Sequence, residues 1–512
     1  MPLVNRLHMA FLHPLPLKAS RTQEWLSVCG LLIFTTVWRF YQVRHLALPA
    51  WVDSVHHTLL VRILLEQGTI PATWGPYLPD TPFYYHFGFH ASAALLAKIC
   101  GLTGLQLGQA VLIVGQLWQV LLVLGVYLLG RALFAGEPAA HEKAFIAMLL
   151  VSLVSEMPAF YVSWGRYTLL AGATLLIGAM AAATAHRWYA LTILTALTAI
   201  THHYALFLLA IFLIISWLGR PRQRVPLCIS AITAAMLISP WLWRVWRLGR
   251  QWIALGTAPD VNAYAYILSL LGPLHNYVLL LIAVLGCLIR VWQMRQDAML
   301  RPRWLPFGIW TLLLCALLGP WQLAPFRADH AVLFIFLPGV IFAAAALGEL
   351  PHPPARWAAV LALLFWGMGS TRNIVRPETV IATAADVAAI EWLAANTPAD
   401  ATFLIDAAPW QGFWRGVDGG WWITPLTGRR TTPPPIAYGW SPLSITQRYN
   451  APPQRLFALT HGPPADYCWR LLTLMQDARA DYYYTRLFPP QNCRALALIY
   501  VGSENIALYK RQ

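Results

Sequence analysis

The sequence predicts an α-helical polytopic membrane protein with an exported α/β domain at its C-terminal end. Hydrophobic residues make up 58% of the 512 residues and charged residues only 11%, whereas soluble domains carry roughly 25% charged residues. Long apolar runs recur along the first part of the chain, and they stop near residue 371, where short helix and strand signals take over. We therefore expect a transmembrane domain over residues 1–371 and a soluble domain over residues 372–512.

About eleven apolar runs predict the transmembrane helices. Crossing the hydrocarbon core takes about 20 apolar residues, and a backbone in lipid must satisfy its own hydrogen bonds, which favours helices. Two short runs are separated only by the polar residues 201–204, so they form either a hairpin or one interrupted helix. The expected spans are residues 23–43, 106–130, 143–161, 168–185, 188–201, 203–218, 225–243, 264–289, 304–320, 331–348 and 355–371.

Basic residues predict the orientation of these helices. Arg and Lys gather in alternate short loops, and such loops favour the cytoplasmic side. With eleven spans, the N-terminus is expected in the cytoplasm and everything after residue 372 outside the plasma or inner membrane. The net charge of +15 is spread over these loops and so does not indicate nucleic-acid binding. The loops carry Arg131 with Lys143, Arg187, Arg220 with Arg222 and Arg224, Arg290 with Arg295, Arg301 and Arg303, and Arg356.

Residues 44–105 do not fit a simple span. They contain the stretch "WVDSVHHTLLVRILLEQG", a loop rich in Pro and Gly, and the half-apolar run "TPFYYHFGFHASAALLAKICGL". His and Lys interrupt both helical pieces, so we expect two amphipathic helices that lie at the outer membrane interface. The alternative is that the second run crosses the membrane. Every later loop would then invert, and the Arg-rich loops would lie outside.

The residues beyond 372 predict a small α/β domain. The stretch "DVAAIEWLAANTPADATFLID" is typical of a helix, a turn and a strand, and "ADYYYTRLF", "ALALIYV" and "NIALYKR" read as further strands. Cys468 and Cys493 are the cysteines of this domain. In an oxidising outer compartment they can form a disulfide, and two free buried thiols are the alternative.

Ionisable residues from several segments are expected at the outer face. Buried ionisable groups at membrane depth are costly and mark functional sites. Each also has a plainer explanation: a His at a helix end is an interfacial polar residue, an Arg can anchor to lipid phosphate, and Asp53 can cap the helix that follows it. Glu156 is harder to explain in this way, because an unpaired carboxylate inside an apolar run is expensive. The set comprises Asp53, His56, His57, Glu156, Arg166, His202, His203, Arg327, Asp329 and His330.

These residues resemble those of a known family. An acidic residue that opens the first outer loop, followed by "GTIP", "PFYYHFGFH" and "KICGL", resembles the first module of the GT-C superfamily, the membrane glycosyltransferases that use lipid-phosphate-linked sugars. The layout of residues 23–350 is similar to that family, and residues 45–105 carry the likeness most specifically. The stretch "DGGWWITPLTGRRTTPPP" is similar to the exported domain of bacterial GT-C-like proteins. The family's usual acidic pair in the first loop is absent, as is the Trp-Trp-Asp signature of oligosaccharyltransferases.

The resemblance implies roles for eight residues of the set. A sugar leaves a polyprenyl phosphate through an oxocarbenium-like transition state, so the acceptor needs a base and the leaving phosphate needs a cation. Asp53 would be the base or a metal-bound carboxylate, with Glu156 orienting it. Arg327 would bind the donor phosphate, helped by Arg166, His202 and His203. His56 and His57 could join Asp53 and Glu156 around a divalent metal ion.

Two other classes of function remain open at this point. A transporter or flippase of lipid-linked sugars would use the same basic cavity without needing Asp53 beside an acceptor. A membrane scaffold with an exported binding domain would tolerate replacement of Asp53 and Arg327. The sequence itself does not name the sugar, the acceptor or the polyprenol.

Overall fold

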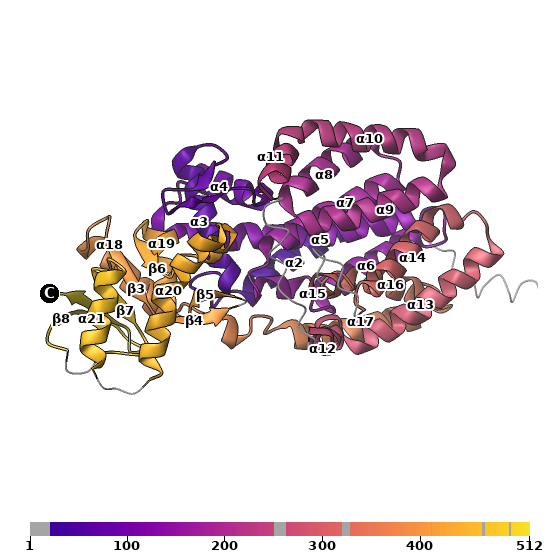
Figure 1. The fold of residues 1–512 in the computed structure, drawn as a ribbon. Helices are drawn as coiled ribbons and strands as arrows, with labels where there is room; N and C mark the ends of the chain where they lie inside the picture. The colour runs from indigo at the N-terminus through magenta and orange to yellow at the C-terminus, as the bar shows by residue number, and fades with distance from the viewer. Residues whose placement is uncertain (1–20, 250–262, 320–327, 411, 463–465, 491–492) are drawn as a thin grey trace, which may run out of the picture.

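The computed structural model describes residues 21–249, 263–319, 328–410, 412–462, 466–490 and 493–512. It has an elongated helical body and a smaller domain of helices and strands at one end of that body (Figure 1). The smaller domain is formed by the C-terminal part of the chain, as expected. Most helices of the body run along its long axis, so the connecting loops collect at its two ends.

Fourteen helices of the described residues form the body. The helices α7 and α16 are almost wholly buried and lie in one apolar core, to which α5, α6, α9, α13 and α14 also contribute. The helices are α2 (Arg21–Gln42), α5 (Leu107–Leu133), α6 (Ala140–Leu153), α7 (Tyr167–Thr184), α8 (Trp188–Thr201), α9 (His203–Gly219), α10 (Arg224–Leu237), α11 (Ser239–Gly249), α12 (Ala263–His275), α13 (Tyr277–Gln296), α14 (Arg301–Ala316), α15 (Ala328–Val332), α16 (Phe336–Gly348) and α17 (Pro353–Thr371).

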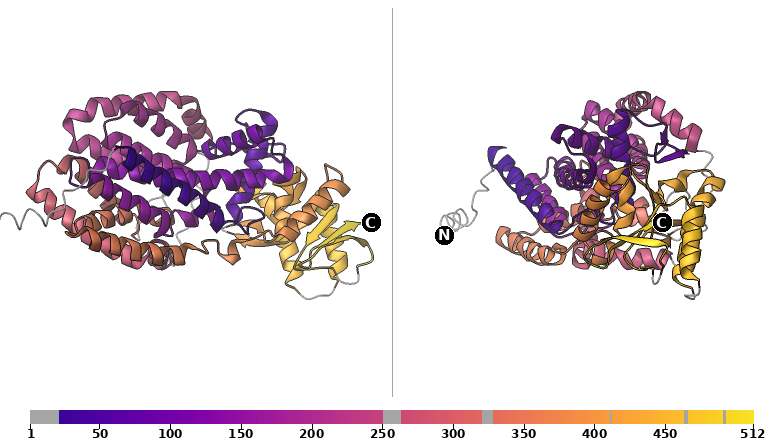
Figure 2. Two further views of the ribbon diagram at one scale, coloured as in Figure 1. Left: turned by 180° about the vertical axis from the view of Figure 1, so that it is seen from behind. Right: turned by 90° about the vertical axis from the view of Figure 1, so that its left-hand side faces the viewer.

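The outer helices expose the apolar surface that a lipid environment would cover. The helix α2 crosses the outside of the body in the rear view (Figure 2), and its Trp25, Leu26 and Val37 are exposed. On α13, Leu281 and Leu288 are exposed as well. Soluble monomers rarely expose contiguous apolar surface of this kind, so the exposed faces agree with a body that is embedded in a membrane.

The expected count of eleven spans is wrong for the described residues. Four helices are long and apolar enough to cross a membrane, namely Gly104–Leu133, Tyr167–Thr184, Tyr277–Gln296 and Asp329–Gly348. The bent pair His203–Gly219 and Pro221–Leu237, with an angle of 118°, would make a fifth. The other runs are helical but do not qualify: α2 and α17 are long enough but not apolar enough, and breaks shorten most of the rest. Residues 143–161, for example, form a helix only as far as Leu153, and residues 225–243 are divided between α10 and α11.

The basic loops meet at the end of the body that lies away from the smaller domain, and acidic side chains tie them together. Glu137 accepts hydrogen bonds from Lys143 (3.1 Å) and Arg290 (2.8 Å). Lys143 also pairs with Glu349 at 2.6 Å, and Arg356 pairs with Glu142 at 2.6 Å. These pairs hold together the loop between α5 and α6, the C-terminal ends of α13 and α16, and the N-terminal end of α17.

Residues 44–105 form two helices joined by a short hairpin. The helix α3 (Val52–Gln67) is followed by β1 (Thr73–Trp74) and β2 (Leu78–Pro82), which pair antiparallel, and then by α4 (Gly88–Cys100). The two helices were expected, but α3 does not lie on a surface: ten of its sixteen residues are buried. By contrast, α4 exposes Leu95 and Ile99 and has the apolar outer face expected of an interfacial helix.

The C-terminal domain is built on a five-stranded mixed sheet. The strand order is β6-β3-β7-β9-β8; β3 is parallel to β6 and β7, and the remaining pairs are antiparallel. The strands are β3 (Thr402–Ile405), β6 (Arg430–Thr432), β7 (Tyr482–Thr485), β8 (Leu496–Val501) and β9 (Ala507–Arg511), and the helices are α18 (Ala384–Asn396), α19 (Ile423–Thr427), α20 (Leu443–Thr460) and α21 (Tyr467–Asp477). The helix–turn–strand and the three later strands expected from the sequence are all present.

One apolar core joins this domain to α3. Val52 and Val55 of α3 lie in the same cluster as Phe403 of β3 and as Trp421 and Trp422, which precede α19. The opposite face of the sheet packs separately against α20 and α21. Residues 44–105, which carry Asp53, and the C-terminal domain therefore share a hydrophobic core and are not joined only by a flexible linker.

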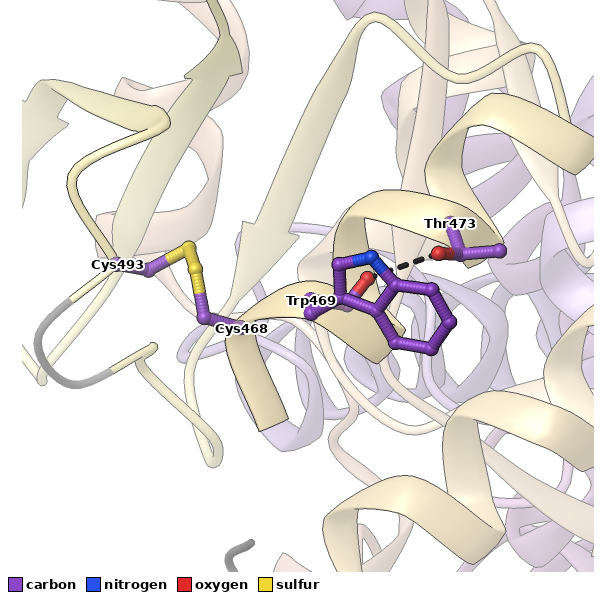
Figure 3. Close-up of a disulfide and its surroundings, with 4 residues drawn as sticks. All are labelled: Cys468, Trp469, Thr473 and Cys493. Carbon is purple, nitrogen blue, oxygen red and sulfur yellow. Dashed lines mark hydrogen bonds between the residues drawn. A yellow bond between two sulfur atoms is a disulfide. The ribbon is translucent and has the colours of Figure 1, made fainter. Parts of the chain in front are cut away.

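Cys468 and Cys493 form the predicted disulfide. It joins the beginning of α21 to the segment before β8, across 25 positions of the sequence (Figure 3). The neighbouring Trp469 is exposed, and its carbonyl oxygen accepts a hydrogen bond of 3.0 Å from the Thr473 hydroxyl. The five other cysteines are free.

Candidate functional site

Asp53 lies in the first turn of α3, at the end of the body that faces the C-terminal domain. The N-cap of α3 is Trp51, which makes no side-chain capping bond, so Asp53 is not the cap that a plainer explanation of its position assumed. Burial raises the pKa of the Asp53 carboxyl to about 6, and the positive charge of Arg166 opposes that rise. Asp53 is therefore a partly desolvated carboxylate with a nearby cation.

Arg166 links Asp53 to a second carboxylate. It immediately precedes α7, and its Nη2 lies 3.5 Å from Oδ2 of Asp329 at the beginning of α15. The other oxygen of Asp329 is 3.0 Å from Nδ1 of His330. Three segments that are distant in sequence, at positions 53, 166 and 329–330, thus meet at one end of the body, as the predicted topology required.

Histidines extend this site from α3 to α9. The rings of His56 and His57 have centroids 4.4 Å apart, and Nδ1 of His57 lies 2.9 Å from Nε2 of His90. The ring of His86 is 4.7 Å from that of His202 and 5.3 Å from that of His203.

Two of these histidines, His86 and His90, were not among the candidates from the sequence. Both lie within the quoted stretch "PFYYHFGFH", but only His90 belongs to α4, because His86 precedes that helix, which begins at Gly88. Their place in the stretch that carries the family resemblance is the signal that could have identified them.

Tyr85 and Trp440 close the side of the site that faces the C-terminal domain. The ring of Trp440, which ends a short 3₁₀ helix of that domain, stacks on Tyr85 at 4.6 Å and on Trp74 at 5.5 Å. It also lies 5.8 Å from the ring of His56. No local sequence pattern points to this contact, because Trp440 follows His56 by hundreds of residues.

Glu156 and Arg327 stand apart from this arrangement in different ways. Glu156 follows α6 in a loop; burial raises its pKa to about 7, and the charge of Arg376 opposes that rise. The two candidate carboxylates, Asp53 and Glu156, therefore have different cationic partners. Arg327 lies outside the described residues, directly before α15 in the sequence.

The residues proposed as metal ligands do not assemble into a metal site. Over the ranges that the structure describes, no group of three or more His, Cys, Asp or Glu side chains is placed to hold an ion. Both ring nitrogens of buried His56 lack a hydrogen-bond partner, but Glu156 faces Arg376 and does not complete a ligand set with it. We therefore assign no catalytic step to a metal ion.

Several solved structures resemble this fold over most of the chain. ArnT from Cupriavidus metallidurans matches with a TM-score of 0.61 at 13% identity, covering 96% of this chain and 98% of that one. The same enzyme bound to undecaprenyl phosphate matches with a TM-score of 0.60 at 12% identity, with the same coverage. The oligosaccharyltransferase of Archaeoglobus fulgidus in complex with Zn and sulfate matches with a TM-score of 0.55 at 13% identity, over 94% of this chain and 73% of that one.

A further match shows that the fold also occurs within longer proteins. The arabinofuranosyltransferase AftD from Mycobacteria has a TM-score of 0.57 at 15% identity, and the match covers 96% of this chain but only 40% of that one. No protein-family model and no curated protein sequence matches this chain. At these identities the likeness is one of fold.

Proposed function

We propose that this chain, which has the fold of the GT-C membrane glycosyltransferases, moves a sugar from a polyprenyl-phosphate-linked donor to an acceptor at the outer membrane face. The likeness to ArnT supports the proposal, because it extends over nearly the whole of both chains and one of the ArnT structures holds undecaprenyl phosphate. Fold alone does not define an activity, so the proposal depends on the side chains at the end of the body.

The observation that carries the proposal is the setting of Asp53. A general base works best when its pKa lies near the operating pH, and the Asp53 carboxyl has a pKa of about 6. At neutral pH it is ionised, yet it is a stronger base than an ordinary aspartate. Asp53 would take the proton of the acceptor hydroxyl as that oxygen attacks C1 of the sugar and the C1–O bond to phosphate breaks.

The leaving phosphate needs positive charge on its own side of the reacting carbon. Arg166 is the cation whose charge acts on Asp53, and Arg327 directly precedes the segment that brings Asp329 to Arg166. We assign both arginines to the donor phosphate, with His202 and His203 beside them. Glu156, the other carboxylate with a raised pKa, would orient the reacting groups and is the alternative base.

We further propose that the C-terminal domain lies outside the membrane and the N-terminus in the cytoplasm. Two features support this orientation. The disulfide of the C-terminal domain suits an oxidising compartment, and the basic loops that gather at the opposite end suit the cytoplasmic side. The site at Asp53 would then face the outside.

The test compares surface glycans and lipid-linked sugars by mass spectrometry in cells with the wild-type gene, without it, and with Asp53→Asn. We expect deletion and Asp53→Asn to remove one sugar from a surface glycan and to leave its lipid-linked donor in excess. Asp297→Asn is the control, because Asp297 caps a turn at the opposite end through a bond from the Met299 amide that asparagine can also accept. Unchanged glycans after deletion would contradict the proposal and favour a scaffold.

A further inference from the structure

The C-terminal domain places a two-stranded hairpin between its sheet and the helical body (Figure 1). The hairpin consists of β4 (Ala407–Trp410) and β5 (Phe413–Gly416), which pair antiparallel. Arg415 on β5 holds its guanidinium carbon 5.3 Å from the ring of Trp51 and 5.3 Å from the ring of Trp410. Trp51 belongs to the body and precedes Asp53 by two residues, so both domains contact this half-buried cation.

Arg415 has no anionic partner among the described residues. Its Nη1 donates a hydrogen bond of 3.3 Å to the carbonyl of Gly416, and its Nε is buried without any partner. Two other arginines of the same domain pair with carboxylates: Arg455 with Asp477 at 2.7 Å, and Arg486 with Asp386 at 3.4 Å. Arg429 has three hydrogen bonds to carbonyl and hydroxyl oxygens. A guanidinium carries five donors, and leaving a desolvated charge uncompensated is costly.

Arg415 is also not the cation that acts on the proposed base, Asp53. Burial lowers the pKa of Arg415, and the cation that acts on the Asp53 carboxyl is Arg166. The site at the N-terminal end of α3 therefore has two cations with different surroundings. Arg166 is shared with Asp329 on the body, whereas Arg415 lies beside two indole rings whose own centroids are 5.3 Å apart, on the side of the C-terminal domain.

We infer that Trp51, Trp410 and Arg415 form an acceptor subsite for a saccharide that carries a phosphate or carboxylate group. A guanidinium binds such groups through two parallel hydrogen bonds, and the electron-rich faces of indole rings suit the C–H faces of a sugar. This inference rests on the proposed transferase function and names its acceptor class. Because Trp51 precedes Asp53 by two residues, a saccharide held by this trio would lie near the N-terminal end of α3.

Binding is tested without turnover, on the full chain in nanodiscs of phosphatidylcholine. Saturation-transfer NMR would follow glucose 6-phosphate and glucuronate, with neutral glucose and inorganic phosphate as the comparison probes. We expect both anionic sugars to bind more tightly than glucose and than phosphate. Arg415→Gln should weaken them by at least about tenfold, the scale of one charge-assisted hydrogen bond, and Arg415→Lys by less, since it keeps the charge without the planar fork.

Arg448→Gln is the matched control. Arg448 belongs to the same domain, but it is exposed and pairs with Asp80, so its loss should not change binding of either sugar. Equal affinity of glucose 6-phosphate for the wild type and for a folded Arg415→Gln variant would overturn the inference. If Arg415→Gln does not fold, Trp410→Leu replaces it: this variant keeps the cation and removes one wall, so it must weaken glucose 6-phosphate but not inorganic phosphate, and any other pattern overturns the inference.

Two more arms separate the possible ligands and functions. Nanodiscs that contain phosphatidylglycerol should leave glucose 6-phosphate binding unchanged; if they abolish it, the anion at Arg415 is a lipid headgroup and the saccharide subsite is refuted. Binding of glucose 6-phosphate that depends on Arg415, in a protein whose deletion changes no glycan, would uphold a site for anionic saccharides and refute the transferase.

Discussion

At the scale of single residues, Asp53 combines a stability cost with a chemical use. Its pKa of about 6 exceeds the ordinary value of 3.8, so the folded state holds the proton more tightly than the unfolded state. As the pH rises through this interval the carboxyl ionises in a desolvated place, and the folded protein loses stability. A carboxylate that costs stability in this way, at the junction of two domains, is a candidate for a functional residue.

The first prediction concerns Asp53→Asn. Transfer should fall roughly 10²–10⁴-fold, the usual contribution of a general base, while donor binding persists because the cations remain. The variant should also unfold at a higher temperature than the wild type at pH 8, since asparagine cannot ionise, and the difference should vanish near pH 4. The transfer rate of the wild type should decline below about pH 6, where Asp53 becomes protonated. A variant that keeps more than a tenth of wild-type transfer would identify Asp53 as a structural residue and direct attention to Glu156.

The second prediction uses the charge of Arg166. Because that charge lowers the pKa of Asp53, Arg166→Gln should raise it further and move the acidic limb of the pH–rate profile toward higher pH. Donor binding should weaken at the same time, as it should in Arg327→Ala, because the phosphate charge exists already in the ground state. The measurements are a pH–rate profile and donor binding with the substrates that the glycan comparison identifies. If the acidic limb of the pH–rate profile does not move in folded Arg166→Gln, then Arg166 does not act on the pKa of Asp53.

Some residues of the site could be predicted from the sequence and others could not. Charges and apolar runs alternate along the chain, and this alternation is a local signal. It was enough to assign four residues to the same end of the helical body, namely Asp53, Arg166, His202 and Asp329. The contacts of Trp440 and Arg415 could not, because they depend on how a distant domain packs against α3. Arg327 lies outside the described residues, so its predicted role in phosphate binding stays a prediction.

At the scale of elements, α3 connects the site to the C-terminal domain. Its Arg62 donates hydrogen bonds to the carbonyls of Pro425 (3.4 Å) and Leu426 (3.2 Å), near the end of α19. Together with the shared apolar core, these bonds hold α3, the helix that carries Asp53, against the C-terminal domain. The sequence correctly predicted α3 as a helix but placed it at the membrane interface, because polar residues interrupt its apolar run. In the structure Phe89, His90 and Tyr167 of the body pack around His57, and Trp440 of the C-terminal domain lies beside His56.

Apolar runs identified helices more reliably than spans. Each of the eleven runs contains a helix in the described residues, but a run measures hydrophobicity and not continuity. His202 illustrates the difference, because its extended backbone (φ −163°, ψ 120°) separates α8 from α9 although the residues on both sides are apolar. Over the ranges that the structure describes, four helices are long and apolar enough to cross a membrane, or five if the bent pair is one span.

The third prediction concerns the disulfide. Removing Cys468–Cys493 by replacing both residues with serine should lower the free energy of unfolding of the C-terminal domain by about 3 kcal/mol, the chain-entropy value for a loop of roughly this length. Urea denaturation followed through the fluorescence of the C-terminal domain measures this effect, with Cys228→Ser, a free cysteine of the body, as the control. Alkylation of both thiols in unreduced, unfolded protein would contradict the disulfide itself.

At the scale of the whole molecule, charge and chemistry are divided between two ends. One end holds the network of Lys143, Arg290 and Arg356 with their glutamates, and the other holds Asp53, the histidines and the disulfide-bonded domain. A lipid-linked donor needs this arrangement, since its phosphate lies at the membrane boundary while its chain stays in hydrocarbon. The division was predictable from sequence because positive loops encode orientation, even though the number of spans was not.

The last prediction tests this polarity directly. Single cysteines at Asp297, in the loop between α13 and α14, and at Ser503, in the turn between β8 and β9, are introduced into a variant whose five free cysteines are serine and whose disulfide is kept. In intact cells an impermeant maleimide should label position 503 and leave position 297 unlabelled, and permeabilised cells should show both. The outcome has a physical cause: moving the Arg-rich loops across the membrane is disfavoured during insertion, whereas the disulfide persists only in an oxidising compartment. Labelling of position 297 in intact cells would show that the protein has the opposite orientation in the membrane. Asp53 would then face the cytoplasm, and transfer at the outer face would be refuted, whatever the fold resembles.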